Sequence, residues 1–215
     1  MKLFVWDFHG VLETGNEFAV REITNMVLKK FGYRKRLSQK ECGGLYGKKW
    51  FEYFQYLLPK ENLDIWMRLQ KECVAIGLEN PELIERHTTA TNHAHEVLRK
   101  IGERHEQILI SNSQPRSLTM FLKIVEMGSY FGKHQVFAVN AHSKNKARHK
   151  VDVLKEFLIN KDYEKVVVIG DSPSDMELGF VSGSIRYLYT HPGRQHREAK
   201  ADFKIDDLRK VLNEL

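Results

Sequence analysis

The chain has 215 residues, of which 42% are hydrophobic and 29% are charged, a balance typical of a soluble globular protein with a full hydrophobic core. No apolar run approaches the roughly 18 residues of a membrane helix, so we expect no membrane span, and no signal peptide precedes the first predicted strand. Lysine and arginine exceed the acids by 34 to 28, and the net charge of +6 favours anionic partners. The only cysteines, Cys42 and Cys73, are too few for a disulfide framework and indicate a reducing cytoplasm.

The first predicted element is a strand over residues 3–6 (LFVW) that ends in a carboxylate, Asp7. A short apolar run bounded by polar residues is typical of a buried parallel strand. His9 and Gly10 follow at once in the stretch VWDFHGVLE. An acid at the end of one strand is often only a cap or a turn residue, so its meaning depends on what the other strand ends carry.

Residues 16–86 contain helical patterns and no convincing strand. We therefore expect an all-helical cap domain over residues 16–87, inserted into a catalytic core made of residues 1–15 and 88–215. Between the first two helices we expect a loop with Gly43, Gly44 and Gly47, beside which Lys48 and Lys49 either face a substrate or are exposed lysines at a helix start. The predicted helices cover residues 17–31, 49–58, 62–76 and 81–86.

Strands and helices alternate after residue 93. The pattern is clearest over residues 151–158, where Val153, Leu154, Phe157 and Leu158 form one apolar stripe. This alternation predicts an α/β fold, a Rossmann-like, doubly wound parallel sheet. The further predicted strands are residues 107–110, 135–139, 166–169 and 185–189, and the helices are residues 93–103, 118–125, 151–158, 175–181 and 208–212.

Polar side chains occupy the ends of several predicted strands. Open parallel sheets bind ligands beyond the carboxyl ends of their strands, where Asp7, the segment Ser111-Asn112-Ser113 and the segment from Gly170 to Asp175 all belong. Lys150 lies at the start of a crossover helix beside them. We expect carboxylates, hydroxyls and an ammonium group to converge on one edge of the sheet.

This set of groups is suited to phosphoryl transfer. Asp7 can act as a nucleophile that accepts the phosphoryl group, and Asp7 with Asp171 can supply the oxygen ligands that Mg²⁺ prefers. Lys150, Ser111 and nearby N–H groups can offset the charge of the phosphoryl oxygens. Gly10 lets the backbone approach the phosphate closely.

The segments DFHGVL, SNS, Lys150 and GDSPSDMELG resemble, in order and spacing, the four motifs of the haloacid dehalogenase-like (HAD) hydrolase superfamily. The helical insertion resembles the cap of its phosphoglycolate-phosphatase-like branch. The resemblance implies a Mg²⁺-dependent phosphatase that acts on a small phosphorylated metabolite through an aspartyl-phosphate on Asp7. It also implies that the metal site includes Asp7, the backbone carbonyl of His9, Asp171 and Asp175, with Asp175 supporting the metal through water or Lys150. The residues implied to bind phosphate are Gly10, Ser111, Asn112 and Lys150.

His9 departs from the family pattern, in which a second aspartate protonates the leaving oxygen and later activates water. Imidazole can give and take a proton near neutral pH, so His9 is a candidate acid/base catalyst. A bulkier side chain can instead shield the acyl-phosphate from water. The first reading predicts a phosphatase, and the second favours a phosphotransferase or mutase. A pseudoenzyme that binds a phosphorylated ligand is a further alternative. Dehalogenase activity is disfavoured, because halide displacement needs no Mg²⁺ and the sequence contains the metal-type motif GDSPSD.

The lysine of the third motif has a second candidate, Lys146, in the basic cluster of residues 144–150. We prefer Lys150 because it stands at the start of the predicted helix. No aromatic residues interleave with this cluster, so we expect no nucleic-acid partner. His93 and His95 do not share a helix face, which disfavours a zinc site. The sequence carries no prediction of the oligomeric state or the leaving group.

Overall fold

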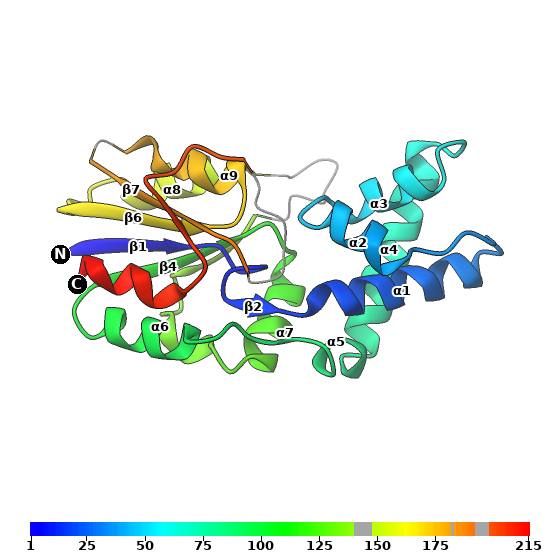
Figure 1. Ribbon diagram of the computed structural model, residues 1–215, viewed down its shortest axis with the longest axis horizontal. Helices are drawn as coiled ribbons and strands as arrows, with labels where there is room; N and C mark the ends of the chain where they lie inside the picture. The colour runs from blue at the N-terminus through cyan, green and yellow to red at the C-terminus, as the bar shows by residue number, and fades with distance from the viewer. Residues whose placement is uncertain (140–147, 182, 192–197) are drawn as a thin grey trace. The chain divides into compact units, whose positions relative to one another are not determined.

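The computed structural model describes residues 1–139, 148–181, 183–191 and 198–215, and it divides the chain into two compact units. One unit joins Met1–Thr14 to Ala90–Leu215, and the other is Gly15–Thr89 (Figure 1). The second unit contains the whole predicted insertion, residues 16–87, whose role as a cap remains a prediction.

The first unit is built on a six-stranded sheet with the strand order β5-β4-β1-β6-β7-β8. All pairings in this sheet are parallel, and β1 lies between β4 and β6. The order reverses direction beside β1, which confirms the predicted doubly wound α/β fold. The strands are β1 (Lys2–Trp6), β4 (Glu106–Ser111), β5 (Val136–Ala138), β6 (Lys165–Gly170), β7 (Ile185–Tyr189) and β8 (Phe203–Ile205).

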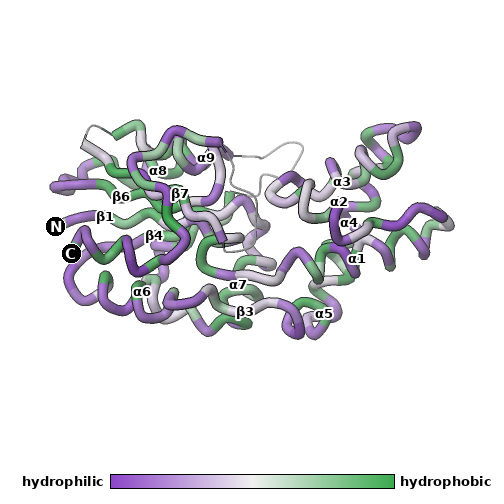
Figure 2. The backbone as a smooth tube through the Cα atoms, viewed as in Figure 1, coloured by the Kyte–Doolittle hydropathy of each residue, from purple (hydrophilic) through white to green (hydrophobic). Residues whose placement is uncertain are grey.

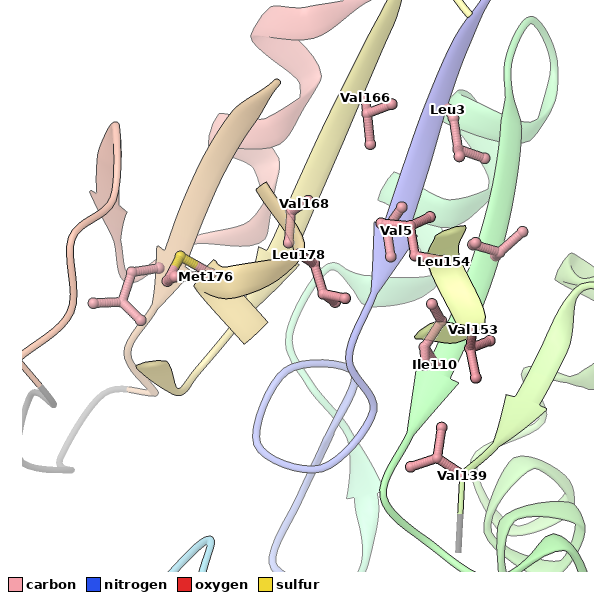
Figure 3. Packing of buried hydrophobic residues seen from close by; sticks show 12 residues of the cluster. Leu3, Val5, Ile110, Val139, Val153, Leu154, Val166, Val168, Met176 and Leu178 are labelled. Atoms are coloured by element: carbon pink, nitrogen blue, oxygen red, sulfur yellow. The ribbon is translucent and has the colours of Figure 1, made fainter. Parts of the chain in front are cut away.

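Helices cover both faces of this sheet, with α8 and α9 on one side and α6 on the other (Figure 1). Side chains alternate along a strand, so Leu3 and Val5 of β1 face α8, where they join Val153 and Leu154 in the core (Figure 3). Both faces of the central strands are therefore buried, and these strands appear mainly hydrophobic in Figure 2. The helical segments of this unit are α6 (Ala94–Gly102), α7 (Pro115–Ile124), η1 (Gly128–Tyr130), α8 (Lys150–Leu158), α9 (Pro173–Met176), η2 (Glu177–Phe180) and η3 (Leu208–Glu214).

The second unit is helical. Its longest helices, α1 and α4, pack against each other, and α3 packs on α4. Polar contacts fix this packing: Trp50 Nε1 donates to Thr24 Oγ1 at 2.8 Å, and the Phe51 N–H donates to Gln70 Oε1 at 3.0 Å. The helices are α1 (Asn16–Lys30), α2 (Gln39–Leu45), α3 (Trp50–Leu57), α4 (Leu63–Glu79) and α5 (Glu82–Glu85), and the short strands β2 (Glu13–Thr14) and β3 (Thr89–Ala90) pair where the chain passes between the units.

The predicted loop with Gly43 and Gly44 is wrong, because these residues lie in helix α2. Ser38 and Glu41 form a reciprocal capping box at its start, and Cys42 and Leu45 are buried. Burial and capping together outweigh the cost of about 1 kcal/mol that each helical glycine carries relative to alanine. Within the described ranges, no helix is both long and apolar enough to cross a membrane.

Candidate active site

Asp7 is held at the carboxyl end of β1. Its backbone N–H donates to the Ile169 carbonyl at 2.9 Å, which extends the pairing of β1 with β6 by one residue, and the residue is only 8% exposed. The chain then turns, with the N–H of Leu12 donating to the Phe8 carbonyl at 2.9 Å. Gly10 has a φ of 80° in this turn, a conformation that glycine adopts without strain. The turn thus leaves the Asp7 carboxylate at the end of the sheet where the parallel strands finish.

Lys150 bridges Asp7, which follows β1, and Asp175, which lies in α9. It is the first residue of α8, and its Nζ donates to Asp7 Oδ1 at 2.5 Å and to Asp175 Oδ1 at 2.7 Å. All three side chains are buried. Lys146, the alternative third-motif lysine, lies outside the described residues. The structure therefore brings Lys150 into direct contact with the two acids.

Asp175 is fixed from two sides at the start of α9. Its Oδ2 accepts hydrogen bonds from the Ser172 N–H at 3.1 Å and from Ser172 Oγ at 2.5 Å, while Oδ1 faces Lys150. A Cβ on Gly170 would lie 2.1 Å from the Cβ of Asp175, so only glycine allows this close approach. The Gly-Asp-Ser turn after β6 is thus shaped around the Asp175 side chain.

Among the residues that the structure describes, the site holds three aspartates, Asp7, Asp171 and Asp175, and one lysine, Lys150. Burial raises the pKa of Asp7, and the charge of Asp175 raises it further, although Lys150 acts in the opposite direction. Burial alone would lower the pKa of Lys150, but the two carboxylates outweigh burial and raise it above its ordinary value. We therefore treat Lys150 as an ammonium at neutral pH, in direct contact with the carboxylates of Asp7 and Asp175.

The acids can offer oxygen ligands to one divalent cation. Asp7, Asp171 and Asp175 each present a carboxylate oxygen, and these three atoms lie within 4.8 Å of one another. Mg²⁺ takes one or two carboxylates together with phosphate and water, so the residues present fit this ion. Both Asp175 oxygens accept hydrogen bonds, Oδ1 from Lys150 and Oδ2 from Ser172.

The predicted phosphate contacts lie on the neighbouring strand. Ser111 is the last residue of β4, which pairs directly with β1, and it is fully buried. Its Oγ accepts a hydrogen bond from the Ser113 N–H at 3.3 Å. Asn112 is exposed in the turn that follows. The roles of Ser111, Asn112 and Gly10 toward phosphate stay predictions.

His9 belongs to a hydrogen-bonded chain that sequence reasoning missed. Its Nδ1 lies 2.7 Å from Glu13 Oε1, and its Nε2 lies 2.8 Å from Ser113 Oγ. Glu13 is fully buried. Both partners stand in segments that the motifs had already singled out, VWDFHGVLE and SNS, but nothing in those segments showed that they meet at His9.

Comparisons with known proteins show which family and which solved structures the chain is similar to. The sequence model of the haloacid dehalogenase-like hydrolases matches residues 1–183. No curated protein matches the chain.

Similar solved structures cover almost the whole chain. A haloacid dehalogenase-like family hydrolase from Streptococcus pneumoniae is 17% identical with a TM-score of 0.75, over 99% of this chain and 97% of that one. A candidate phosphoglycolate phosphatase from Lactobacillus plantarum is 13% identical with a TM-score of 0.73, over 99% and 98% of the two chains. A candidate β-phosphoglucomutase from Thermotoga maritima is 20% identical with a TM-score of 0.67, over 100% of both.

These likenesses show a shared fold, and the match of the family model extends over most of the chain. The chain belongs to the haloacid dehalogenase-like hydrolase family.

Proposed function

We propose that this hydrolase is a Mg²⁺-dependent phosphatase that cleaves a small phosphate monoester through an aspartyl-phosphate on Asp7. One observation carries the proposal: the Asp7 carboxylate is buried at the end of β1, bonded to the Lys150 ammonium, with Asp171 and Asp175 oxygens within 4.8 Å. A nucleophile, a fixed positive charge and a set of metal-binding oxygens are the parts that phosphoryl transfer requires.

The residues have separate tasks in the proposed reaction. The Asp7 carboxylate attacks phosphorus, and the bond between phosphorus and the leaving oxygen breaks. His9 gives a proton to that oxygen and later takes one from the water that hydrolyses the aspartyl-phosphate. Lys150 offsets the negative charge beside Asp7, while Ser111, Asn112 and the N–H groups near Gly10 hold the phosphoryl oxygens.

Asp7, Asp171 and the backbone carbonyl of His9 are the proposed Mg²⁺ ligands, with Asp175 supporting them. When bound, Mg²⁺ supplies positive charge against the phosphoryl oxygens. The helical unit is inserted directly after the turn that carries Asp7 and His9, which supports a role as the cap that selects the substrate. Cys42 and Cys73 are both free and buried, in keeping with a proposed cytoplasmic location.

A phosphotransferase is the second candidate. Both ring nitrogens of His9 already have partners, Glu13 and Ser113, so the ring activates water only after Ser113 gives way. Slow hydrolysis would leave the aspartyl-phosphate for another hydroxyl acceptor. The fold shared with a candidate β-phosphoglucomutase is compatible with this alternative.

Phosphate release from a panel of phosphorylated metabolites, with and without Mg²⁺, tests the proposal. We expect metal-dependent release that Asp7→Asn abolishes and that Asp206→Asn, a change of an exposed acid paired with Lys210, leaves intact. Release that persists after chelation, or in Asp7→Asn, would contradict the mechanism. A lasting protein-bound phosphoryl group that an added sugar or nucleoside discharges would instead identify the phosphotransferase.

A further inference from the structure

Three side chains form a continuous hydrogen-bonded chain beside the proposed nucleophile. Glu13 Oε1 lies 2.7 Å from His9 Nδ1, and His9 Nε2 lies 2.8 Å from Ser113 Oγ. His9 lies in the turn after β1, Glu13 is the first residue of β2, and Ser113 lies in the turn after β4. Two side chains from separate parts of the chain, Glu13 and Ser113, thus contact the two nitrogens of one imidazole.

Aromatic packing holds the imidazole in this position. The ring of Phe121 lies edge-on to the His9 ring at 4.7 Å between centroids, and the Phe8 ring does so at 5.1 Å. The His9 side chain is still 26% exposed, so its surroundings leave a path for a reacting group. The ring is therefore oriented without being sealed from solvent.

The carboxylate determines which nitrogen carries the proton. An ionised carboxylate can only accept hydrogen bonds, so Nδ1 of His9 must donate to Glu13, and in neutral imidazole Nε2 is then the bare acceptor for the Ser113 hydroxyl. Glu13 is fully buried, and among the described residues its Oε2 has no hydrogen-bond partner. A buried carboxylate needs a compensating donor, and His9 is the donor that the structure provides.

We infer that Glu13 is a positioning residue that keeps a proton on Nδ1 of His9, so that Nε2 is the atom that exchanges protons during turnover. The inference rests on the proposed phosphatase function. In the first step His9 starts as the imidazolium, with protons on both nitrogens: the Asp7 oxygen forms a bond to phosphorus, the bond from phosphorus to the leaving oxygen breaks, and the Nε2 proton passes to that oxygen. In the second, water forms a bond to phosphorus, the bond to Asp7 breaks, and a water proton passes to Nε2. The Nδ1 proton stays between His9 and Glu13 throughout, and the reacting oxygen takes the place of the Ser113 hydroxyl.

The ¹⁵N NMR signals of His9 in the full-length protein test the proton position directly. In the neutral form of the ring, identified by following both ¹⁵N signals as the pH is raised, we expect a protonated Nδ1 and an unprotonated Nε2. Assignment uses the signals that disappear in His9→Gln. A neutral His9 protonated at Nε2 would overturn the inference, whether or not the protein proves to be a phosphatase.

Glu13→Gln tests the cause of that tautomer. A glutamine amide can donate to Nδ1, so we expect the proton to move to Nε2 in this variant. Glu96→Gln is the matched control, because Glu96 Oε2 lies 3.4 Å from Nδ1 of His93 on an exposed helix surface. This control replaces a carboxylate that contacts a different histidine, His93, so the His9 signals should not change. An unchanged His9 tautomer in folded Glu13→Gln would overturn the inference.

The kinetic readout is the rate at which the aspartyl-phosphate disappears, measured in samples quenched with acid at successive times. We expect Glu13→Gln to slow this decay by about 100- to 10,000-fold, the usual contribution of general acid–base catalysis, with KM changed by less than about threefold. Wild-type decay in a folded Glu13→Gln protein would contradict the inference. Failure of the wild-type protein to form any adduct would contradict the proposed function instead.

Ser113→Ala keeps the inference testable if Glu13→Gln does not fold. This variant removes the partner of Nε2 and leaves Glu13 in place, so we expect His9 to keep its proton on Nδ1. A reversed tautomer in Ser113→Ala would mean that Ser113 sets the proton position, and it would overturn the role inferred for Glu13.

Discussion

Replacing Lys150 by methionine should destabilise the protein strongly when no divalent cation is present. Methionine keeps the unbranched shape of the side chain but removes the ammonium group that contacts Asp7 at 2.5 Å and Asp175 at 2.7 Å. The two carboxylates then remain buried beside each other without their shared cation. Part of the cost falls on Asp7, whose pKa is already raised by burial and by Asp175.

Removing one partner of a buried ion pair typically costs about 3–5 kcal/mol in the free energy of unfolding. For a chain of this size each 1 kcal/mol lowers the melting temperature by about 2–4 °C, so we expect Lys150→Met to melt roughly 6–20 °C below the wild type. Mg²⁺ should restore part of this loss, because it returns positive charge to the same carboxylates.

Thermal and urea unfolding in the presence of a chelator measure this effect. The control is Lys210→Met, which removes an ion pair of similar length, 2.6 Å to Asp206, from a surface where the two side chains are 52% and 67% exposed. Exposed pairs contribute about 0–1 kcal/mol, so the control should melt within about 4 °C of the wild type. Equal melting temperatures for the two variants would refute the electrostatic reasoning about the buried site.

Three further predictions concern the metal and the helical unit. Asp171→Asn should weaken Mg²⁺ binding at least about tenfold in titration calorimetry while the protein stays folded, and unchanged affinity would exclude Asp171 as a ligand. Because burial raises the pKa of Asp7, protons compete with Mg²⁺, so the affinity should rise with pH until Asp7 is ionised and then level off; a flat profile would contradict this. Ser38→Ala should cost about 1 kcal/mol at neutral pH in urea unfolding. Hydrogen bonds from Ser38 lower the pKa of Glu41 from 4.5 to about 2. The part of the stabilisation that comes from the ionised Glu41 carboxylate is therefore complete above pH 4.5 and is lost as the pH falls toward about 2.

Much of the fold could be predicted because the central strands are buried on both faces. Runs such as VVVI in β6 carry this signal without reference to any partner. By contrast β8 is short, and two of its three residues, Phe203 and Lys204, are exposed, so its sequence resembles a loop. Helix α2 was missed because Gly43 and Gly44 have poor helix propensity, although the capping pair of Ser38 and Glu41 was visible in the sequence.

The convergence of acids and lysine could be anticipated from topology. Parallel strands end at one edge, so Asp7 and Asp171 had to lie near each other, and Lys150 at a helix start could reach them. The partners of His9 could not be anticipated in the same way. Glu13 meets His9 only because of how the turn after β1 folds, and Ser113 reaches it from another strand end. Such contacts depend on loop geometry, which a single sequence leaves open.

The most direct test of the account is to locate the phosphoryl group during a single turnover. Protein mixed with Mg²⁺ and a phosphorylated substrate found in the panel is quenched in acid, digested and examined by mass spectrometry. The account predicts a transient, hydroxylamine-sensitive phosphoryl adduct on the peptide that contains Asp7, absent from Asp7→Asn. Turnover without this adduct, or an adduct on another residue, would contradict it.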